Sequence, residues 1–138
     1  MRDLKKTDRN KVVLDDAVSG TKIGIYYTTP TASQIRSYRQ QSIRRKGGKV
    51  IVDTFGPALK CGLEIISGFD DGAFGYDGSP ISSDPGSPYF REDWKKLLEE
   101  TAADIVTLVA QIAFDGVKTD RLDDIEIGEE GEPVIPLG

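Results

Sequence analysis

Histidine is absent from the 138 residues, and cysteine, methionine and tryptophan occur once each. Without histidine there is no Ser-His-Asp triad, no Cys-His pair, no histidine metal ligand and no imidazole that titrates near neutral pH. The single Cys61 cannot form a disulfide within the chain. The first residues, MRDLKKTDRN, have no apolar stretch after their charges, so we expect no secretory signal and a cytoplasmic protein.

Charge is divided unevenly along the chain. Residues 1–60 contain 13 Lys and Arg against 5 Asp and Glu, whereas residues 61–138 contain 5 against 18, which together give the formal net charge of −5. Such a chain can pair its two halves, bind partners of either sign or stack with copies of itself. Nucleic acid is not an expected partner, because the acidic half would repel phosphates.

The length suits one domain, and we predict a single globular domain over residues 1–118 with an acidic tail over 119–138. β-rich stretches at 11–14 and 22–28 predict an N-terminal hairpin, in which Ile23, Ile25 and Tyr27 alternate on one face. Asp77-Gly78 between short extended stretches predicts a second, smaller hairpin with a type I′ turn.

Three helices are predicted. Thr31 and Gln34 match a capping box at the start of a helix that runs to about Lys46. The next runs from about Thr54 to Ser67, with residues 50–52 either a strand or an added turn. The last runs from Ser87-Pro88 to Gly116, about 26 residues, on the order of 40 Å. The predicted fold class is therefore α+β, mainly helical, with an N-terminal β-hairpin and a small second hairpin before a long C-terminal helix.

The long helix is apolar on nearly all sides in its second half. Between Ile105 and Phe114 only Thr107 and Gln111 are polar, so the rest of the domain or another subunit must cover it. The apolar run is shorter than the roughly 20 residues of a membrane span. The residues predicted to form a packing or self-association face are Trp94, Leu98, Ile105, Leu108, Val109 and Ile112.

The predicted helix over 31–46 is rich in arginine. One interpretation is a solvated face with cations near the helix C-terminus, where the macrodipole favours them. The other is a basic patch that faces an acidic partner or the acidic half of a neighbouring copy. The residues of this patch are Arg36, Arg39, Arg44 and Arg45.

Catalytic motifs are lacking in the sequence. Gly-x-Ser-x-Gly does not occur. The acidic residues between 70 and 84 do not have the spacing of a calcium loop, and the glycines there do not form a phosphate loop. Cys61 is predicted to be a packed, unreactive thiol. We therefore expect a non-enzymatic protein without catalytic, metal or cofactor-binding residues.

Five short segments resemble those of a known family: YYTTPT (26–31), SYR (37–39), CGLEIISGF (61–69), GSPISSD (78–84) and YFREDWKKLL (89–98). Over about residues 20–116 the chain is similar to the tail assembly chaperones of long-tailed bacteriophages and prophages. The resemblance implies a mostly helical helper in the host bacterial cytoplasm that self-associates and coats the tape-measure protein until tail-tube subunits polymerise around it. It also implies that this chain is the short form of a pair whose longer member arises by frameshifting.

Two other interpretations remain open at this point. The chain is alternatively a structural virion component, such as a tail-completion or head–tail connector protein, which would stay in the finished particle. A small nucleic-acid-binding regulator would use the arginine-rich helix, and it predicts salt-sensitive DNA binding.

Overall fold

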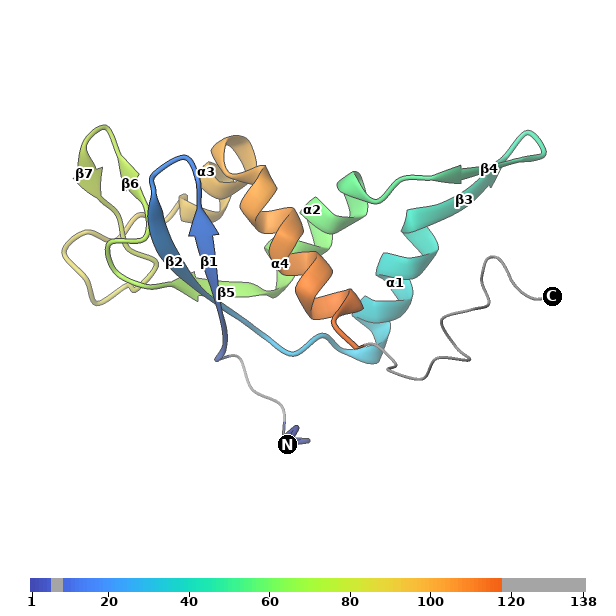
Figure 1. Ribbon diagram of the computed structural model, residues 1–138, viewed down its shortest axis with the longest axis horizontal. Helices are drawn as coiled ribbons and strands as arrows, with labels where there is room; N and C mark the ends of the chain where they lie inside the picture. Colours follow the sequence, from blue (N-terminus) through green and yellow to red (C-terminus); the bar gives the residue numbers. More distant parts are fainter. Residues whose placement is uncertain (6–8, 118–138) are drawn as a thin grey trace.

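The computed structural model describes residues 1–5 and 9–117. Helices and short antiparallel strands alternate along the chain, so the fold is mixed α+β (Figure 1). Helices account for 38% of the residues and strands for 28%. The predicted α+β class is therefore confirmed, but the strand content is higher than "mainly helical" implies. The elements are β1 (Asn10–Asp16), β2 (Thr21–Tyr27), α1 (Ala32–Ser42), β3 (Ile43–Lys46), β4 (Lys49–Val52), α2 (Phe55–Ile65), β5 (Ile66–Phe69), β6 (Gly75–Tyr76), β7 (Ser79–Pro80), α3 (Trp94–Thr101) and α4 (Ala103–Asp115).

The N-terminal hairpin is confirmed as β1 and β2, which pair from Asn10 with Tyr27 to Asp16 with Thr21. Ile23 and Ile25 point into the core and are 1% and 0% exposed, as the alternation predicts. The hairpin gains a third strand, because β5 pairs with the other edge of β2. The predicted helix to Ser67 is wrong at this point: the helix ends at Ile65, and the apolar residues after it complete the sheet.

α1 begins as predicted and ends earlier than predicted. The Thr31 hydroxyl accepts from the Gln34 N–H, and the Gln34 side chain accepts from the Thr31 N–H, which forms the capping box. The helix stops at Ser42, and residues 43–46 instead form β3, which pairs with β4. Gly47 and Gly48 turn this hairpin at φ of +58° and +79°, which glycine adopts without strain. We call the β3–β4 hairpin the arm.

The second half of the fold departs from the predicted long helix. The small hairpin β6–β7 is confirmed, with Asp77 and Gly78 both at positive φ. Residues 87–93 are not helical, Phe90 forms an isolated bridge with Ser82, and the helix begins only at Trp94. It is then broken at Ala102 (φ −137°, ψ 37°) into α3 and α4. The Thr101 hydroxyl donates to the Leu97 carbonyl at 2.6 Å, a side-chain bond of the kind that bends helices.

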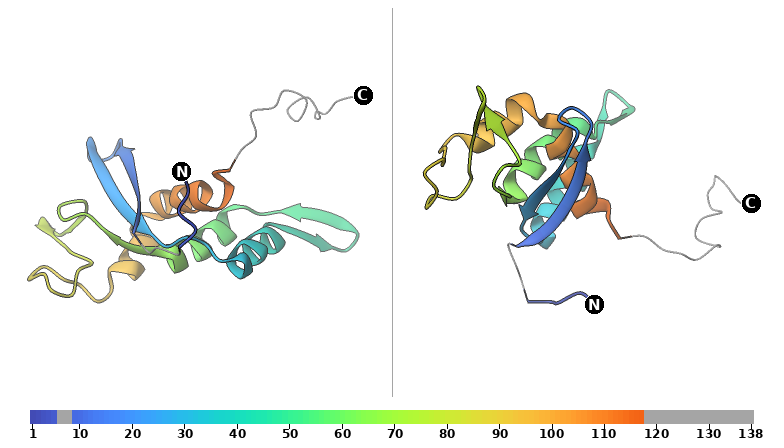
Figure 2. Two further views of the ribbon diagram at one scale, coloured as in Figure 1. Left: turned by 90° about the horizontal axis from the view of Figure 1, so that it is seen from below. Right: turned by 60° about the vertical axis from the view of Figure 1, so that its left-hand side comes forward.

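Two apolar clusters hold these elements together. The larger lies between the three-stranded sheet and the α3 and α4 helices, and its fully buried members include Ile66, Val106 and Val109. The smaller joins α1, α2 and the end of α4, where the Tyr38 and Phe114 rings stack at 4.6 Å. The arm contributes no residue to either cluster and extends from the helices at one end of the molecule (Figure 1, Figure 2).

Candidate protein-binding surface

The predicted basic patch is spread over two elements. Arg36 and Arg39 lie on α1, whereas Arg44 and Arg45 lie on β3 and point to opposite faces of the arm, because successive side chains of a strand alternate. All four are exposed. Placing all four on one helix was therefore wrong, because the hairpin turned by Gly47-Gly48 takes residues 43–46 out of the helix.

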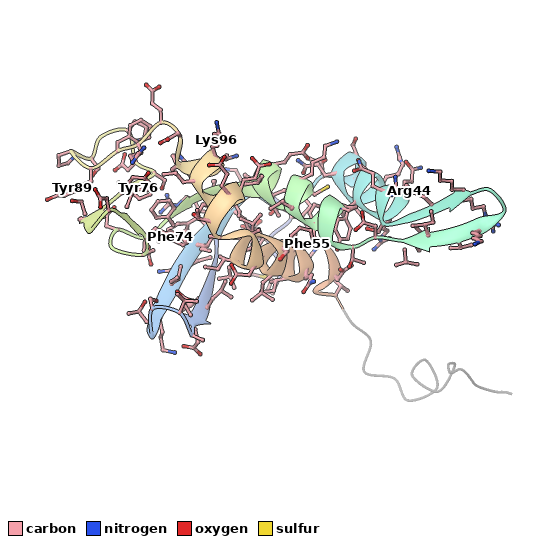
Figure 3. The ribbon with its side chains drawn as sticks, turned by 90° about the horizontal axis from the view of Figure 1, so that it is seen from above. Arg44, Phe55, Phe74, Tyr76, Tyr89 and Lys96 are labelled. Atoms are coloured by element: carbon pink, nitrogen blue, oxygen red, sulfur yellow. The ribbon has the colours of Figure 1, made fainter. Side chains whose placement is uncertain are left out.

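The arm carries an exposed apolar face that the sequence reasoning missed. Ile43 pairs with Val52, and Val50 lies two residues along on the same face; the three are 60%, 66% and 55% exposed. Phe55, in the first turn of α2, is 57% exposed close to the base of the arm. In Figure 3, Phe55 is labelled near the middle of the molecule and Arg44 farther toward the arm, while Tyr76 and Tyr89 lie at the other end. Gly47-Gly48 before the β-rich stretch 49–52 was the signal for this hairpin.

The predicted self-association face on the C-terminal helix divides into three groups. Leu98 and Val109 are core residues, 3% and 0% exposed. Trp94 and Ile105 pack against the same core. Leu108 and Ile112 lie one turn apart on the outer side of α4 and are 42% and 36% exposed. Regular spacing selected all six residues, but only these last two have the exposure that a contact with another molecule requires.

An open hollow joins the outer face of α4 to the base of the arm. Its lining includes Leu108, Ile112 and Gly116 from the end of α4, together with Thr54, two residues after β4. Tyr38 of α1 closes one side, and its hydroxyl donates to Asp115 Oδ2 at 3.2 Å. Burial, and then the Asp115 carboxylate, raise the pKa of Tyr38, so this hydroxyl stays protonated and donating at neutral pH. The hollow therefore lies between the outer side of α4, Tyr38 and the start of α2 at Thr54.

A polar cluster surrounds the carboxylate of Asp70, the residue that follows β5. Asp70 accepts from the Tyr26 hydroxyl at 2.7 Å and pairs with Lys11 Nζ at 2.9 Å, while Arg9 lies over the Tyr26 ring at 4.2 Å. The Lys11 ammonium, and then the Tyr26 hydroxyl, lower the pKa of Asp70. The Asp70 N–H also donates to the Gly24 carbonyl. These contacts hold the end of β5 against β1 and β2, so the role of Asp70 is structural.

Two other potentially reactive groups, the thiol of Cys61 and the amine of Lys95, are engaged in the packing of the molecule. Cys61 is 2% exposed, and burial raises the pKa of its thiol, which disfavours the nucleophilic thiolate. Lys95 donates to the Leu63 carbonyl at 2.7 Å, and burial lowers its pKa. Within residues 1–5 and 9–117, no group of three or more acidic or cysteine side chains is arranged to hold a metal ion. No helix in the same residues is long and apolar enough to cross a membrane.

No protein-family model, curated protein or solved structure matches the chain. The fold and the surfaces described above are therefore the basis for assigning a class of protein: a small α+β domain with an exposed apolar and basic arm. The predicted acidic tail, residues 119–138, lies outside the described residues.

Proposed function

We propose that this protein is a non-enzymatic assembly factor that binds another protein, and more specifically a phage tail assembly chaperone. In this role it binds the tape-measure protein in the cytoplasm of the host bacterium, self-associates along it and helps the tail-tube protein to polymerise. The general role is supported by the surface of the molecule. The specific role is supported by the five sequence segments that resemble the chaperone family.

The observation that carries the general proposal is the exposed apolar surface around the arm. Ile43, Val50 and Val52 on the arm and Leu108 and Ile112 on α4 are all at least 36% exposed, and the hollow beside Leu108 and Ile112 reaches Thr54, two residues after β4. Large apolar side chains grouped on one surface are typical of protein-binding sites. Cations at the edge of such a surface favour acidic partners and guide their approach.

A helix of the partner is the shape that suits this surface. An amphipathic helix binds through apolar residues three and four positions apart, which fit a hydrophobic groove. The hollow between Thr54 and Leu108 offers such a groove, and Arg39 and Arg44 lie on the elements next to it. A long helical partner would present many such stretches, so many copies of this chain would bind along it.

The proposal is tested by co-expressing the chain with the tape-measure protein of the same phage or prophage, followed by pull-down and sizing in moderate salt. We expect several copies of this chain on each partner molecule. The double variant Leu108→Asp and Ile112→Asp should reduce the bound copies at least tenfold, while Lys96→Glu, an exposed charge change outside this surface, should not.

A soluble partner with no bound copies would contradict the chaperone proposal. The structural virion component is the alternative, and purified particles distinguish the two: a chaperone is lost from the finished particle, whereas a tail-completion or head–tail connector protein stays in it. Stoichiometric amounts of this chain in washed particles would therefore replace the first proposal with the second.

A further inference from the structure

A second hollow lies at the end of the molecule away from the arm. It is a cavity of about 270 Å³ between the β1–β2 turn, β6 and the junction of α3 with α4. Figure 1 shows β6 and α3 at one end of the molecule and the arm at the other, and Figure 3 labels Tyr76 at the first end and Arg44 toward the second. We call this hollow the distal groove, and its lining includes Asp16, Val18, Tyr76, Leu97, Asp104 and Ile105. The arm of a chain is therefore too far away to enter the distal groove of the same chain.

Apolar side chains of the distal groove are exposed in the single chain. Val18, in the β1–β2 turn, is 91% exposed, and Tyr76 is 51% exposed. Leu97 and Ile105, which pack against the core, are only partly buried and add to this surface. Grouped apolar side chains of this kind are typical of sites that bind another protein. A partner should therefore place aliphatic side chains in the distal groove.

Two carboxylates line the distal groove, and they differ in their contacts. Asp16 accepts from the Ser19 hydroxyl at 2.8 Å and from the Val18 N–H at 3.1 Å, so it holds the β1–β2 turn. Asp104 is exposed in the first turn of α4, and its carboxylate forms no ion pair with the described residues. Asp104 is therefore the group that can pair with a cation of another molecule.

One face of the arm has the complementary chemistry. Ile43 with Val52 and Arg45 with Val50 are cross-strand pairs, and the alternation along each strand places these four side chains on the same face. All four are exposed. This face can therefore fill an apolar groove and supply a guanidinium group to the carboxylate that lines it.

The two ends of the molecule also carry opposite charge. α1, the arm and its turn contain six cations and no acidic residue, and no ion pair of the described residues involves them. Residues 70–104, which contain β6, β7, α3 and the start of α4, have nine acidic and three basic residues, a balance of −6. Complementary potentials of this kind guide the arm end of one copy toward the distal groove of another.

We propose that the arm of one copy of this chain binds in the distal groove of a second copy. Val50 contacts Val18 in this arrangement, and Arg45 pairs with Asp104. A bound pair still has one free arm and one free distal groove, because the two surfaces lie at opposite ends of each chain. The contact is therefore heterologous and repeats from copy to copy.

This inference rests on the proposed function for its biological role, and it names the surfaces through which the copies self-associate. The distal groove does not include the outer side of α4, so the hollow beside Leu108 and Ile112 stays open in every copy. Copies joined in this way would present that hollow repeatedly along one helical partner.

Sedimentation velocity of the full chain at several concentrations tests the contact without any partner protein. We expect the mass of the wild type to rise with concentration beyond that of a dimer. Val50→Asp and Val18→Asp should each weaken association at least tenfold at unchanged melting temperature, because both positions are exposed in the free chain. Val13→Asp, 56% exposed on β1 and outside the lining of the distal groove, is the matched control and should associate like the wild type.

A mixture of the two variants tests the direction of the contact. Val50→Asp keeps an intact distal groove and Val18→Asp keeps an intact arm, so together they should form a one-to-one heterodimer and nothing larger. A mixture that stays monomeric would overturn the proposal, as would a wild type that is monomeric at every concentration or stops at a dimer. The ion pair is tested in the same way: Arg45→Asp and Asp104→Arg should each weaken association, and a chain with both changes should recover it.

Pull-down with the tape-measure protein separates this inference from the proposed function. Val18→Asp keeps the hollow on α4, so it should still bind the partner but in fewer copies than the wild type. A wild type that self-associates through the arm yet does not bind the partner would contradict the proposed function alone. A wild type that binds the partner, with Val18→Asp bound in equal number, would contradict the contact between arm and distal groove alone.

Discussion

The close approach of α2 to α4 depends on a residue without a side chain. A Cβ atom at Gly62 would lie 2.7 Å from the carbonyl oxygen of Val106 and 2.9 Å from its Cγ1 atom. Backbone atoms of a packed helix cannot move aside as the end of a flexible side chain can. Gly62 therefore sets the distance between the two helices that join both apolar clusters.

Gly62→Ala should lower the free energy of unfolding by about 1–3 kcal/mol, the usual cost of overpacking a core. This outcome opposes helix propensity, by which alanine is favoured over glycine in a helix. Gly56→Ala in the first turn of α2 is the control, because its nearest neighbour is the mobile Asp53 carboxylate at 3.2 Å. Urea unfolding measures both. A Gly62→Ala protein as stable as the wild type would contradict the close packing.

Asp70 makes stability depend on acid pH. Its folded pKa lies below the ordinary value of 3.8, so the unfolded chain takes up a proton more readily, and stability decreases as the pH falls through this range. The carboxylate is 40% exposed, so solvent screening limits the contribution to less than about 1 kcal/mol. We expect Asp70→Asn to be less stable than the wild type at pH 7, and this difference should shrink as the pH falls below 3.8 and disappear once the pH lies below the folded pKa, where both side chains are neutral.

Thermal melting at several pH values measures this difference. Asp15→Asn is the control, because Asp15 pairs only with Lys22 at a site where both side chains are more than 70% exposed. A constant gap between Asp70→Asn and the wild type from pH 7 to pH 2 would show that the carboxylate charge is not what matters.

At the scale of elements, the features set by neighbouring residues were predictable from the sequence. The capping box at Thr31 and the turn at Asp77-Gly78 each depend on side chains or φ angles within four residues. β5 was missed because it is a strand only through pairing with β2, some 40 residues earlier. The break at Ala102 was missed because no glycine or proline marks it.

The arm should unfold independently of the body of the molecule. Gly48 has φ of +79°, and a Cβ in this left-handed region costs about 1–2 kcal/mol. Gly48→Ala should therefore speed hydrogen exchange at Arg44 and Ile51, which pair across the arm, and leave the melting temperature unchanged. Gly47→Asn, a residue that tolerates such angles, is the control. A lower melting temperature in Gly48→Ala would show that the arm belongs to the same cooperative unit as the core.

At the scale of the whole molecule, the sequence pointed to the C-terminal helix as a candidate surface but could not show which of its faces is exposed. The second half of α4 is apolar on nearly all sides, so spacing alone cannot distinguish Val109, at 0% exposure, from Leu108, at 42%. The distinction depends on α2 and the sheet, which cover one side only. The Arg44 and Arg45 positions were unpredictable for a similar reason, since they follow from pairing with β4.

Adjacent residues on α4 therefore separate folding from self-association. Val109→Asp places a carboxylate in the core, a change that costs several kcal/mol and should unfold the chain. Leu108→Asp places the same group on the exposed side and should change stability by less than about 1 kcal/mol. If the outer face of α4 mediates self-association, Leu108→Asp should shift the protein to lower mass at unchanged melting temperature.

Circular dichroism during melting and sedimentation velocity at several concentrations make the comparison. Gln111→Asp, an exposed polar position on the same helix, controls for the added charge. An oligomer of unchanged mass in Leu108→Asp would remove α4 from the self-association surface and leave the apolar face of the arm, Ile43, Val50 and Val52, as the place where copies meet. A folded Val109→Asp protein would mean that α4 does not pack on the body through this side.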